Sequence, residues 1–294
     1  MKTAYIYNIP DWAVHNVGKL WFGHRDDVDL LNWHNTSGEE LKKYDHIIFG
    51  LYTIYEDFKY NKHNCTVVIH DPCEVFDQNV GWKQSHKVTS AANKIKHIRN
   101  LIVISEEMEY RIHKEIGRMT YRIPTMTLDE PGEVKDRETC KVISIFNRYP
   151  RKRPDFIVKL QKQLKNAGIE MYIKTTKDNM LSREEYIQKL DSHDIYVCAS
   201  FQEGGPLPAL DAMNRGLMVI STPVGQMREM IKTGHNGILC NHLSIKQWIE
   251  HLNENRGEIK RMQKASLETI RKQRNIQDIR KTVDDYLERK SHEE

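Results

Sequence analysis

Short β-branched runs alternate with amphipathic stretches along this chain, and that alternation is typical of a parallel sheet covered by helices. In the first half, the predicted strands are residues 3–9, 27–33, 46–51, 66–70 and 101–105. In the second half, they are residues 142–146, 169–174, 194–199 and 218–221. The predicted helices include residues 11–22, 155–166, 180–190 and 275–290. The pattern therefore predicts the α/β class.

The periodicity breaks between residues 129 and 140, where Asp129-Glu130-Pro131-Gly132 precedes a charged run. Proline and glycine in such a cluster are typical of a loop. A chain of 294 residues is long enough for two domains of about 140 residues each. We therefore expect an N-terminal domain over residues 1–135 and a C-terminal domain over residues 136–294.

Composition excludes some classes of protein. No apolar run approaches the roughly 20 residues that a membrane span needs, and the start of the chain runs into a strand without a signal sequence. We therefore expect a cytoplasmic protein with no membrane span. The five cysteines are scattered without C-x-x-C spacing, which argues against a zinc site or a disulfide framework.

A glycine- and proline-rich turn in the C-terminal half is the most informative motif. Glu203 lies at its mouth, and the turn Gly204-Gly205-Pro206-Leu207-Pro208 leads to a helix expected to start near Ala209. The glycines let the backbone approach a ligand, and the first N–H groups of the helix would point at an anion. Asp211, eight residues after Glu203, falls in the first helical turn, where it could accept hydrogen bonds from sugar or ribose hydroxyls.

Two cations follow the strand at 142–146. Arg148 and Lys152 come directly after its carboxyl end, so they can converge on one diphosphate, Arg as a planar fork and Lys as a point charge. Arg151 could fill the role assigned to Lys152. A run such as Arg151-Lys152-Arg153 is more often a solvated loop, but its position at the end of a strand favours a binding role.

The string around Glu203 resembles the donor-binding signature of the retaining, GT-B-fold glycosyltransferases of family 4. That signature is an acid, seven residues and a second acid, then Ala-Met, a glycine, an apolar strand and another glycine. The matching positions here are Glu203, Ala212-Met213, Gly216, residues 218–221 and Gly225, followed by Glu229, Gly234 and Gly237. Asp211 stands where the family has the second Glu, which leaves the ribose contact plausible with a shorter side chain.

The resemblance implies the GT-B fold, with two Rossmann-like domains whose parallel sheets face across a cleft. It implies metal-independent transfer of a hexosyl or pentosyl group from a UDP- or GDP-sugar to an acceptor hydroxyl, with retention of configuration and no cofactor beyond the donor. Arg148 and Lys152 would neutralise the leaving diphosphate. Glu203 and the backbone of Gly204, Gly205, Pro206 and Leu207 would hold sugar hydroxyls.

In the N-terminal half, the resemblance points to two further residues. His70, at the end of the strand at 66–70, matches the histidine that contacts the transferred sugar, although it could simply cap the strand. Gly18 is the candidate for the glycine of the first loop that faces the diphosphate. The last helix, residues 275–290, crosses back onto the first domain in GT-B proteins, and a plain amphipathic core helix is the equal alternative.

Several alternatives remain open at this point. Asp27-Val28-Asp29 is a D-x-D, the metal-binding signature of the other major glycosyltransferase fold, although three-residue patterns often arise by chance. The acceptor could be a glycan, a lipid or modified DNA. The acid-free stretch 83–99 and the small N-terminal domain suggest a phage-type enzyme that glycosylates hydroxymethylated bases. A non-catalytic nucleotide-sugar-binding module, an epimerase and a sugar phosphorylase are the other candidates.

Overall fold

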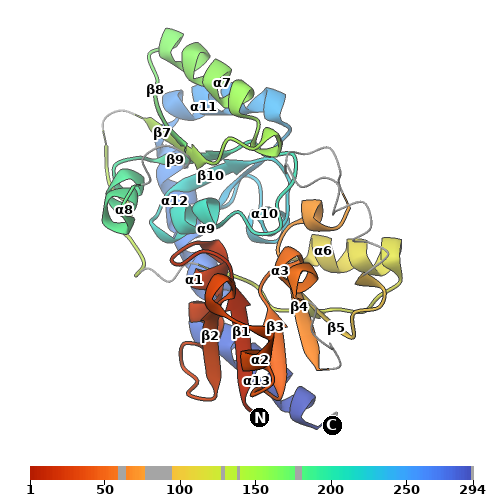
Figure 1. Cartoon of the computed structure of the whole chain (residues 1–294). Coiled ribbons are helices and arrows are strands. Elements are labelled where there is room, and N and C mark those ends of the chain that lie inside the picture. Colours follow the sequence, from red (N-terminus) through yellow and green to blue (C-terminus); the bar gives the residue numbers. More distant parts are fainter. Residues whose placement is uncertain (59–63, 77–94, 127–129, 138–139, 176–180, 293–294) are drawn as a thin grey trace. The chain divides into compact units, whose positions relative to one another are not determined.

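The computed structural model describes residues 1–58, 64–76, 95–126, 130–137, 140–175 and 181–292, and the chain forms two compact units (Figure 1). Unit 1 contains the described residues up to 126 together with those from 274 onward. Unit 2 contains the described residues from 130 to 273. Each unit has its own parallel β-sheet and its own covering helices, so the predicted α/β class with two parallel sheets is confirmed.

The sheet of unit 1 has six parallel strands in the order β2-β1-β3-β4-β5-β6. The strands are β1 (Thr3–Tyr7), β2 (Val28–Asn32), β3 (His46–Phe49), β4 (Cys65–Ile69), β5 (Asn100–Val103) and β6 (Tyr121–Arg122). Among the described residues, the α-helices of this unit are α1 (Ala13–Phe22), α2 (Gly38–Leu41), α3 (Tyr52–Asp57), α6 (Glu106–Arg111) and α13 (Ile276–Ser291). The sequence pattern predicted the first five strands and missed β6, which has only two residues.

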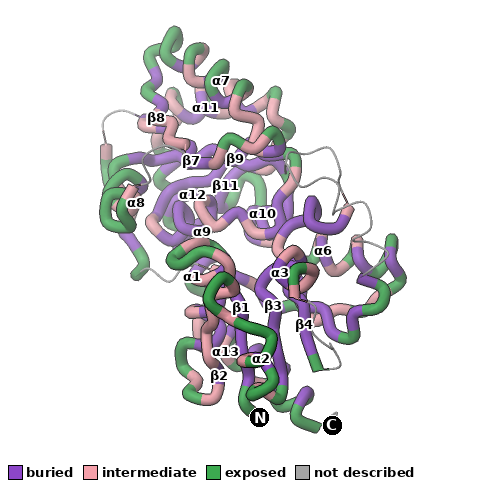
Figure 2. Tube along the Cα trace, in the orientation of Figure 1, coloured by how far each residue is buried: buried purple, intermediate pink, exposed green. Residues whose placement is uncertain are grey.

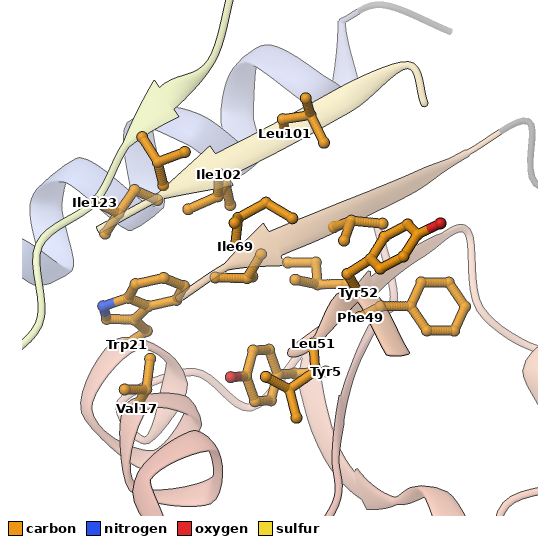
Figure 3. Close-up of a cluster of buried hydrophobic side chains, with 14 of the residues drawn as sticks. Tyr5, Val17, Trp21, Phe49, Leu51, Tyr52, Ile69, Leu101, Ile102 and Ile123 are labelled. Atoms are coloured by element: carbon orange, nitrogen blue, oxygen red, sulfur yellow. The ribbon is translucent and has the colours of Figure 1, made fainter. Parts of the chain in front are cut away.

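The central strands of this sheet are buried because helices cover them. Every residue of β3, β4 and β5 is buried, and Figure 2 shows β1, β3 and β4 almost entirely in the buried colour. Figure 3 shows part of this core, with Trp21 of α1 and Tyr5 of β1 in one cluster of apolar side chains. A strand buried on both faces reads as a continuous apolar run, and residues 47–49 and 67–69 have that character.

The last helix belongs to unit 1. α13 packs against α1, and its buried side chains recur at helical spacing. They are Ile279, Val283, Tyr286 and Leu287, which all join the core of this unit. The ion pair between Arg25 and Asp284, at 2.8 Å, links the loop after α1 to the same helix.

The sheet of unit 2 has five parallel strands in the order β11-β10-β9-β7-β8. The strands are β7 (Lys141–Phe146), β8 (Glu170–Thr175), β9 (Ile195–Cys198), β10 (Met218–Ser221) and β11 (Gly237–Leu239). The α-helices are α7 (Pro154–Asn166), α8 (Arg183–Asp191), α9 (Leu207–Asn214), α10 (Met227–Met230), α11 (Ile245–Glu254) and α12 (Arg256–Gln273). The sequence pattern predicted four of these strands and missed the short edge strand β11.

The strand order identifies where a ligand crevice opens in each unit. In an open parallel sheet, ligands bind outside the carboxyl ends of the strands at the point where the chain changes its direction of winding. In unit 2, the chain moves from β7 to β8 on one side and then to β9 on the other, so this point lies between β7 and β9. In unit 1, the corresponding point lies between β1 and β3.

Candidate functional site

The two loops at the switch point of unit 2 carry the predicted cations and the predicted acid. The loop after β7 ends in a 3-10 turn, Pro150–Lys152, and the loop after β9 leads to Glu203. A backbone hydrogen bond from the Phe201 N–H to the Arg151 carbonyl, at 2.8 Å, joins the two loops. Residues about 50 positions apart in the sequence therefore come together at the carboxyl ends of two adjacent strands.

Glu203 is the centre of this cluster. Its carboxylate is buried and accepts a hydrogen bond from the Arg151 guanidinium at 2.9 Å, and its other oxygen accepts from the Ser200 hydroxyl at 2.7 Å. The Lys152 ammonium contacts that second oxygen too. Burying a carboxylate is costly unless it is paired and hydrogen-bonded, and three partners meet that requirement here.

The charges of this cluster do not cancel. Burial alone would raise the pKa of the Glu203 carboxyl, but the charges of Lys152 and Arg151 outweigh burial and lower that pKa to about 2. Glu203 is therefore ionised at neutral pH and neutralises one of the two cations. One positive charge is left over, next in sequence to a turn whose backbone N–H groups have no acceptor among the described residues.

Those N–H groups belong to the turn that precedes α9. The helix starts at Leu207, two residues before the predicted start near Ala209; Pro206 occupies its N-cap position, and Pro208 fits its first turn because no hydrogen bond is needed from its nitrogen there. Among the residues that the structure describes, the N–H groups of Gly204, Gly205 and Leu207 have no acceptor. An anion can accept hydrogen bonds from such groups, and the helix dipole favours it.

The turn is held in place by a second glycine loop. Gly225 lies against the backbone of the turn in a left-handed conformation, with φ at +45°. A Cβ atom there would come within 2.2 Å of the Gly204 carbonyl oxygen and 2.4 Å of the Glu203 carbonyl oxygen. The next residue, Gln226, donates its backbone N–H to the Gly204 carbonyl at 2.9 Å. Only glycine allows this close approach.

Asp211 is buried in α9 and already has two partners on α8. Its carboxylate accepts a hydrogen bond from the Tyr186 hydroxyl at 2.9 Å and another from the Arg183 guanidinium at 3.2 Å. Burial and the charge of Asp211 both raise the pKa of Tyr186 well above its usual value. The hydroxyl therefore stays protonated and donates to the acid.

Arg148 does not join the Glu203 cluster. Its side chain is exposed, and it makes no hydrogen bond or ion pair with the part of the chain that the structure describes. The run 151–153, by contrast, is not simply a solvated loop, since the Arg151 side chain is only 7% exposed and the Lys152 side chain 13%.

His70 follows β4 directly, at the carboxyl edge of the unit 1 sheet. Its backbone N–H donates to the buried Glu74 carboxylate at 2.9 Å, while its ring Nε2 is buried without a hydrogen-bond partner among the described residues. Burial lowers the pKa of His70 to about 4, against a smaller opposing effect of the Gly50 backbone. The imidazole is therefore neutral at physiological pH.

The prediction that Gly18 lies in the first loop is wrong. Gly18 is in the middle of α1, where it is buried against β1. A Cβ atom there would lie 2.6 Å from the ring of Tyr5. The glycine lets the helix pack closely on the strand, which accounts for its presence.

The two aspartates of the D-x-D pattern, Asp27 and Asp29, form ion pairs within unit 1. Asp27 pairs with Arg25 at 2.7 Å, and Asp29 accepts from the Tyr44 hydroxyl at 2.7 Å and pairs with Lys2 at 3.3 Å. Over the described ranges, no group of three or more histidine, cysteine or acidic side chains is placed to hold a metal ion.

None of the described helices combines the length and the apolar character of a membrane span. Most of the acid-free stretch, residues 83–94, lies outside the described residues.

Comparison with protein families identifies the segment that contains this site. Residues 132–255 match the model of the family described as glycosyl transferases group 1. This segment belongs to the group 1 glycosyl transferases. The match covers the signature from Glu203 to Gly237 and both loops of the cluster, so the resemblance drawn from the sequence is confirmed.

Solved structures agree with this assignment at the level of the fold. Anabaena HepE in complex with UDP-glucose is similar with a TM-score of 0.74 and 13% identity, over 98% of this chain and 99% of that one. Sucrose-phosphate synthase from Thermosynechococcus elongatus gives a TM-score of 0.75 at 13% identity, over 99% of both chains. The structure of S. aureus TarM is similar with a TM-score of 0.67 and 20% identity. The similarity extends over 83% of this chain and 57% of the TarM chain. No curated protein matches the sequence.

Some residues that contact the candidate site were not predicted from the sequence. Ser200 hydrogen-bonds Glu203, and Tyr186 and Arg183 hydrogen-bond Asp211. Ser200 stands three residues before Glu203, so its closeness to the acid was a usable signal. Nothing in the sequence connects α8 with Asp211, because that contact depends on how α8 and α9 pack.

Proposed function

We propose that this chain transfers a sugar from a UDP-sugar to a hydroxyl group of an acceptor, with retention of configuration and without a metal ion. The observation that carries the proposal is the cluster at the switch point of unit 2. Arg151 and Lys152 converge there on Glu203 and leave one positive charge over, and the turn that follows Glu203 offers the N–H groups of Gly204, Gly205 and Leu207 without an acceptor among the described residues. A doubly charged diphosphate is the ligand that fits such a place.

The chemistry follows from where the charge develops. Cleavage of the bond between the sugar and the diphosphate places negative charge on the diphosphate, and preorganised cations and N–H dipoles stabilise that charge in the transition state. We assign this role to Lys152, to the α9 N-terminus and to exposed Arg148, which has no competing partner among the described residues. Glu203, ionised and buried, is placed to accept hydrogen bonds from sugar hydroxyls, together with the backbone from Gly204 to Leu207.

The family and the neighbouring structures support the choice of donor. TarM, HepE and the pneumococcal O-GlcNAc transferase GtfA were each solved with UDP or UDP-glucose, which favours UDP over GDP as the nucleotide here. We assign the ribose to the region of Asp211 in unit 2. The acceptor class is left to experiment, with a glycan, a lipid and modified DNA as the candidates.

The proposal is tested by screening the purified protein with UDP-, GDP-, ADP- and CMP-sugars for thermal stabilisation and for release of the nucleotide. The screen is run with and without EDTA, and with and without duplex DNA that contains hydroxymethylated bases. We expect one UDP-sugar to stabilise the protein and to be hydrolysed slowly, with a rate that EDTA does not change. DNA-dependent release would identify DNA as the acceptor.

A matched pair of variants places the activity at the proposed site. Lys152→Met removes a cation from the cluster, and Lys159→Met removes an exposed cation from α7 of the same unit. Losing one charge contact to the transition state should lower the rate about 100-fold in the first variant and leave the second unchanged. Binding of a UDP-sugar without any turnover would favour a non-catalytic module, and equal rates in both variants would contradict the site.

A further inference from the structure

We propose that Arg151 and Lys152 have different roles at Glu203. Arg151 stays bound to the Glu203 carboxylate and positions it for the sugar, whereas Lys152 leaves the carboxylate and binds the diphosphate. The proposal rests on the proposed function. It makes Arg151 a positioning residue and assigns it no contact with the donor.

The contacts of the two cations differ. The Arg151 guanidinium binds two buried acceptors, the Glu203 carboxylate at 2.9 Å and the Gln202 carbonyl at 3.1 Å. Its side chain is only 7% exposed, and its own carbonyl accepts the Phe201 N–H. The guanidinium cannot turn to a new ligand without breaking both of these buried hydrogen bonds, which is costly in a place with little access to water.

Lys152 is held much less firmly. Among the described residues, the only partner of its ammonium is the Glu203 carboxylate. Its side chain is 13% exposed, and it carries a point charge on a flexible stem that can turn to another anion by rotation about its own bonds. Lys152 also ends the 3-10 turn Pro150–Lys152, so its backbone position does not depend on the ion pair.

Glu203 tolerates the loss of one cation and not of both. When Lys152 leaves, the carboxylate keeps the Arg151 guanidinium and the Ser200 hydroxyl, one on each oxygen. Without Arg151, the departure of Lys152 would leave a buried anion with a single hydroxyl partner. We call the contact of Arg151 with the Glu203 carboxylate the clamp. The clamp keeps Glu203 ionised and fixed while Lys152, its second cation, binds the diphosphate.

The experiment compares Arg151→Met, Lys152→Met and Lys159→Met. Affinity for UDP and for UDP-glucose is measured by calorimetry, kcat and KM for UDP-glucose hydrolysis are measured separately, and the Glu203 carboxyl is titrated by carbon-13 NMR. Arg151→Met should keep the affinity for UDP within about threefold and lower kcat about 100-fold, because a misplaced sugar contact costs rate. Lys152→Met should lower the affinity for UDP at least tenfold, the size of one charged hydrogen bond.

A conservative replacement of Arg151 distinguishes a positioning role from a general loss of structure. Arg151→Lys keeps the charge but not the fork, so it should recover part of kcat with UDP affinity unchanged; it also serves if Arg151→Met does not fold. The proposal is overturned if loss of Arg151 weakens UDP as much as loss of Lys152, since Arg151 would then be a diphosphate ligand. It is overturned as well if the Glu203 titration is the same in wild type and in the Arg151 variants.

The NMR titration also distinguishes this proposal from the proposed function. If the wild-type protein binds neither UDP nor UDP-glucose, the function fails. An upward shift of the Glu203 titration in Arg151→Met would in that case still support the clamp, because it depends on the protein alone.

Discussion

Replacement of Gly225 by alanine should disrupt the turn that follows Glu203. The new Cβ atom would meet the carbonyl oxygens of Gly204 and Glu203 at 2.2 and 2.4 Å, and both of these are backbone atoms that cannot rotate away. The residue also has φ at +45°, which a side chain disfavours. The turn must therefore move, and Glu203 must move with it.

The size of the effect follows from two contributions. A residue with a Cβ atom in the left-handed region costs about 1–2 kcal/mol, and forcing an extra methyl group into a packed place costs about 1–3 kcal/mol. Together, these lower the free energy of unfolding of unit 2 by about 2–5 kcal/mol. Displacement of the turn should also weaken UDP binding at least tenfold, since Glu203 and the N–H groups of Gly204 and Gly205 would be displaced with it.

Gly234 is the matched control. It belongs to the same unit and has φ at +79°, but a Cβ atom there would meet nothing within 4 Å. Gly234→Ala should therefore cost only the backbone contribution of about 1–2 kcal/mol and leave UDP binding unchanged. Urea unfolding followed by circular dichroism gives the stabilities, and calorimetry gives the affinities. If Gly225→Ala is no less stable than Gly234→Ala, the close approach of the two loops is refuted.

Two further predictions concern the buried polar groups. The pKa of His70 is about 4 in the folded protein and near its ordinary value when unfolded, so only the unfolded state gains this proton as pH falls from about 6.5 to about 4. Stability should therefore decrease over that interval, and urea unfolding of His70→Asn should show a smaller decrease; parallel curves would contradict burial of the ring. Tyr186→Phe removes the donor to the Asp211 carboxylate and should lower the free energy of unfolding by about 1.5–3 kcal/mol. Tyr172→Phe, whose hydroxyl makes no hydrogen bond within the described ranges, is the control, and equal losses in the two variants would exclude the hydrogen bond as the cause.

The sequence was most informative where the determining residues are contiguous. The strands were predicted because buried parallel strands need continuous apolar runs, and the turn after Glu203 was predicted because glycine and proline act through local backbone geometry. The acid at 203 and the acid at 211 share one segment with that turn. Gly18 shows the limit of this reasoning: glycine signals a close approach, but the sequence does not say whether the approaching group is a ligand or, as here, the ring of Tyr5.

The partners of the site residues could not be predicted because they come from distant segments. Arg151 and Glu203 are 52 positions apart and meet only because β7 and β9 are neighbours in the sheet. Tyr186 reaches Asp211 across 25 positions through the packing of two helices. For the cations after β7, spacing alone left Arg151 and Lys152 interchangeable, and a basis for proposing different roles comes only from their contacts in the folded chain.

The sequence by itself determined the α/β class, the positions of nine of the strands and the segment around Glu203 that carries the family signature. These are local properties, since hydrophobic periodicity and turn chemistry act over a few residues. Only the tertiary structure decided which cations contact Glu203, which groups hold Asp211, and that α13 completes the core of unit 1. Those outcomes depend on strand order and helix packing, in which the free energy comes from contacts between segments that the sequence keeps far apart.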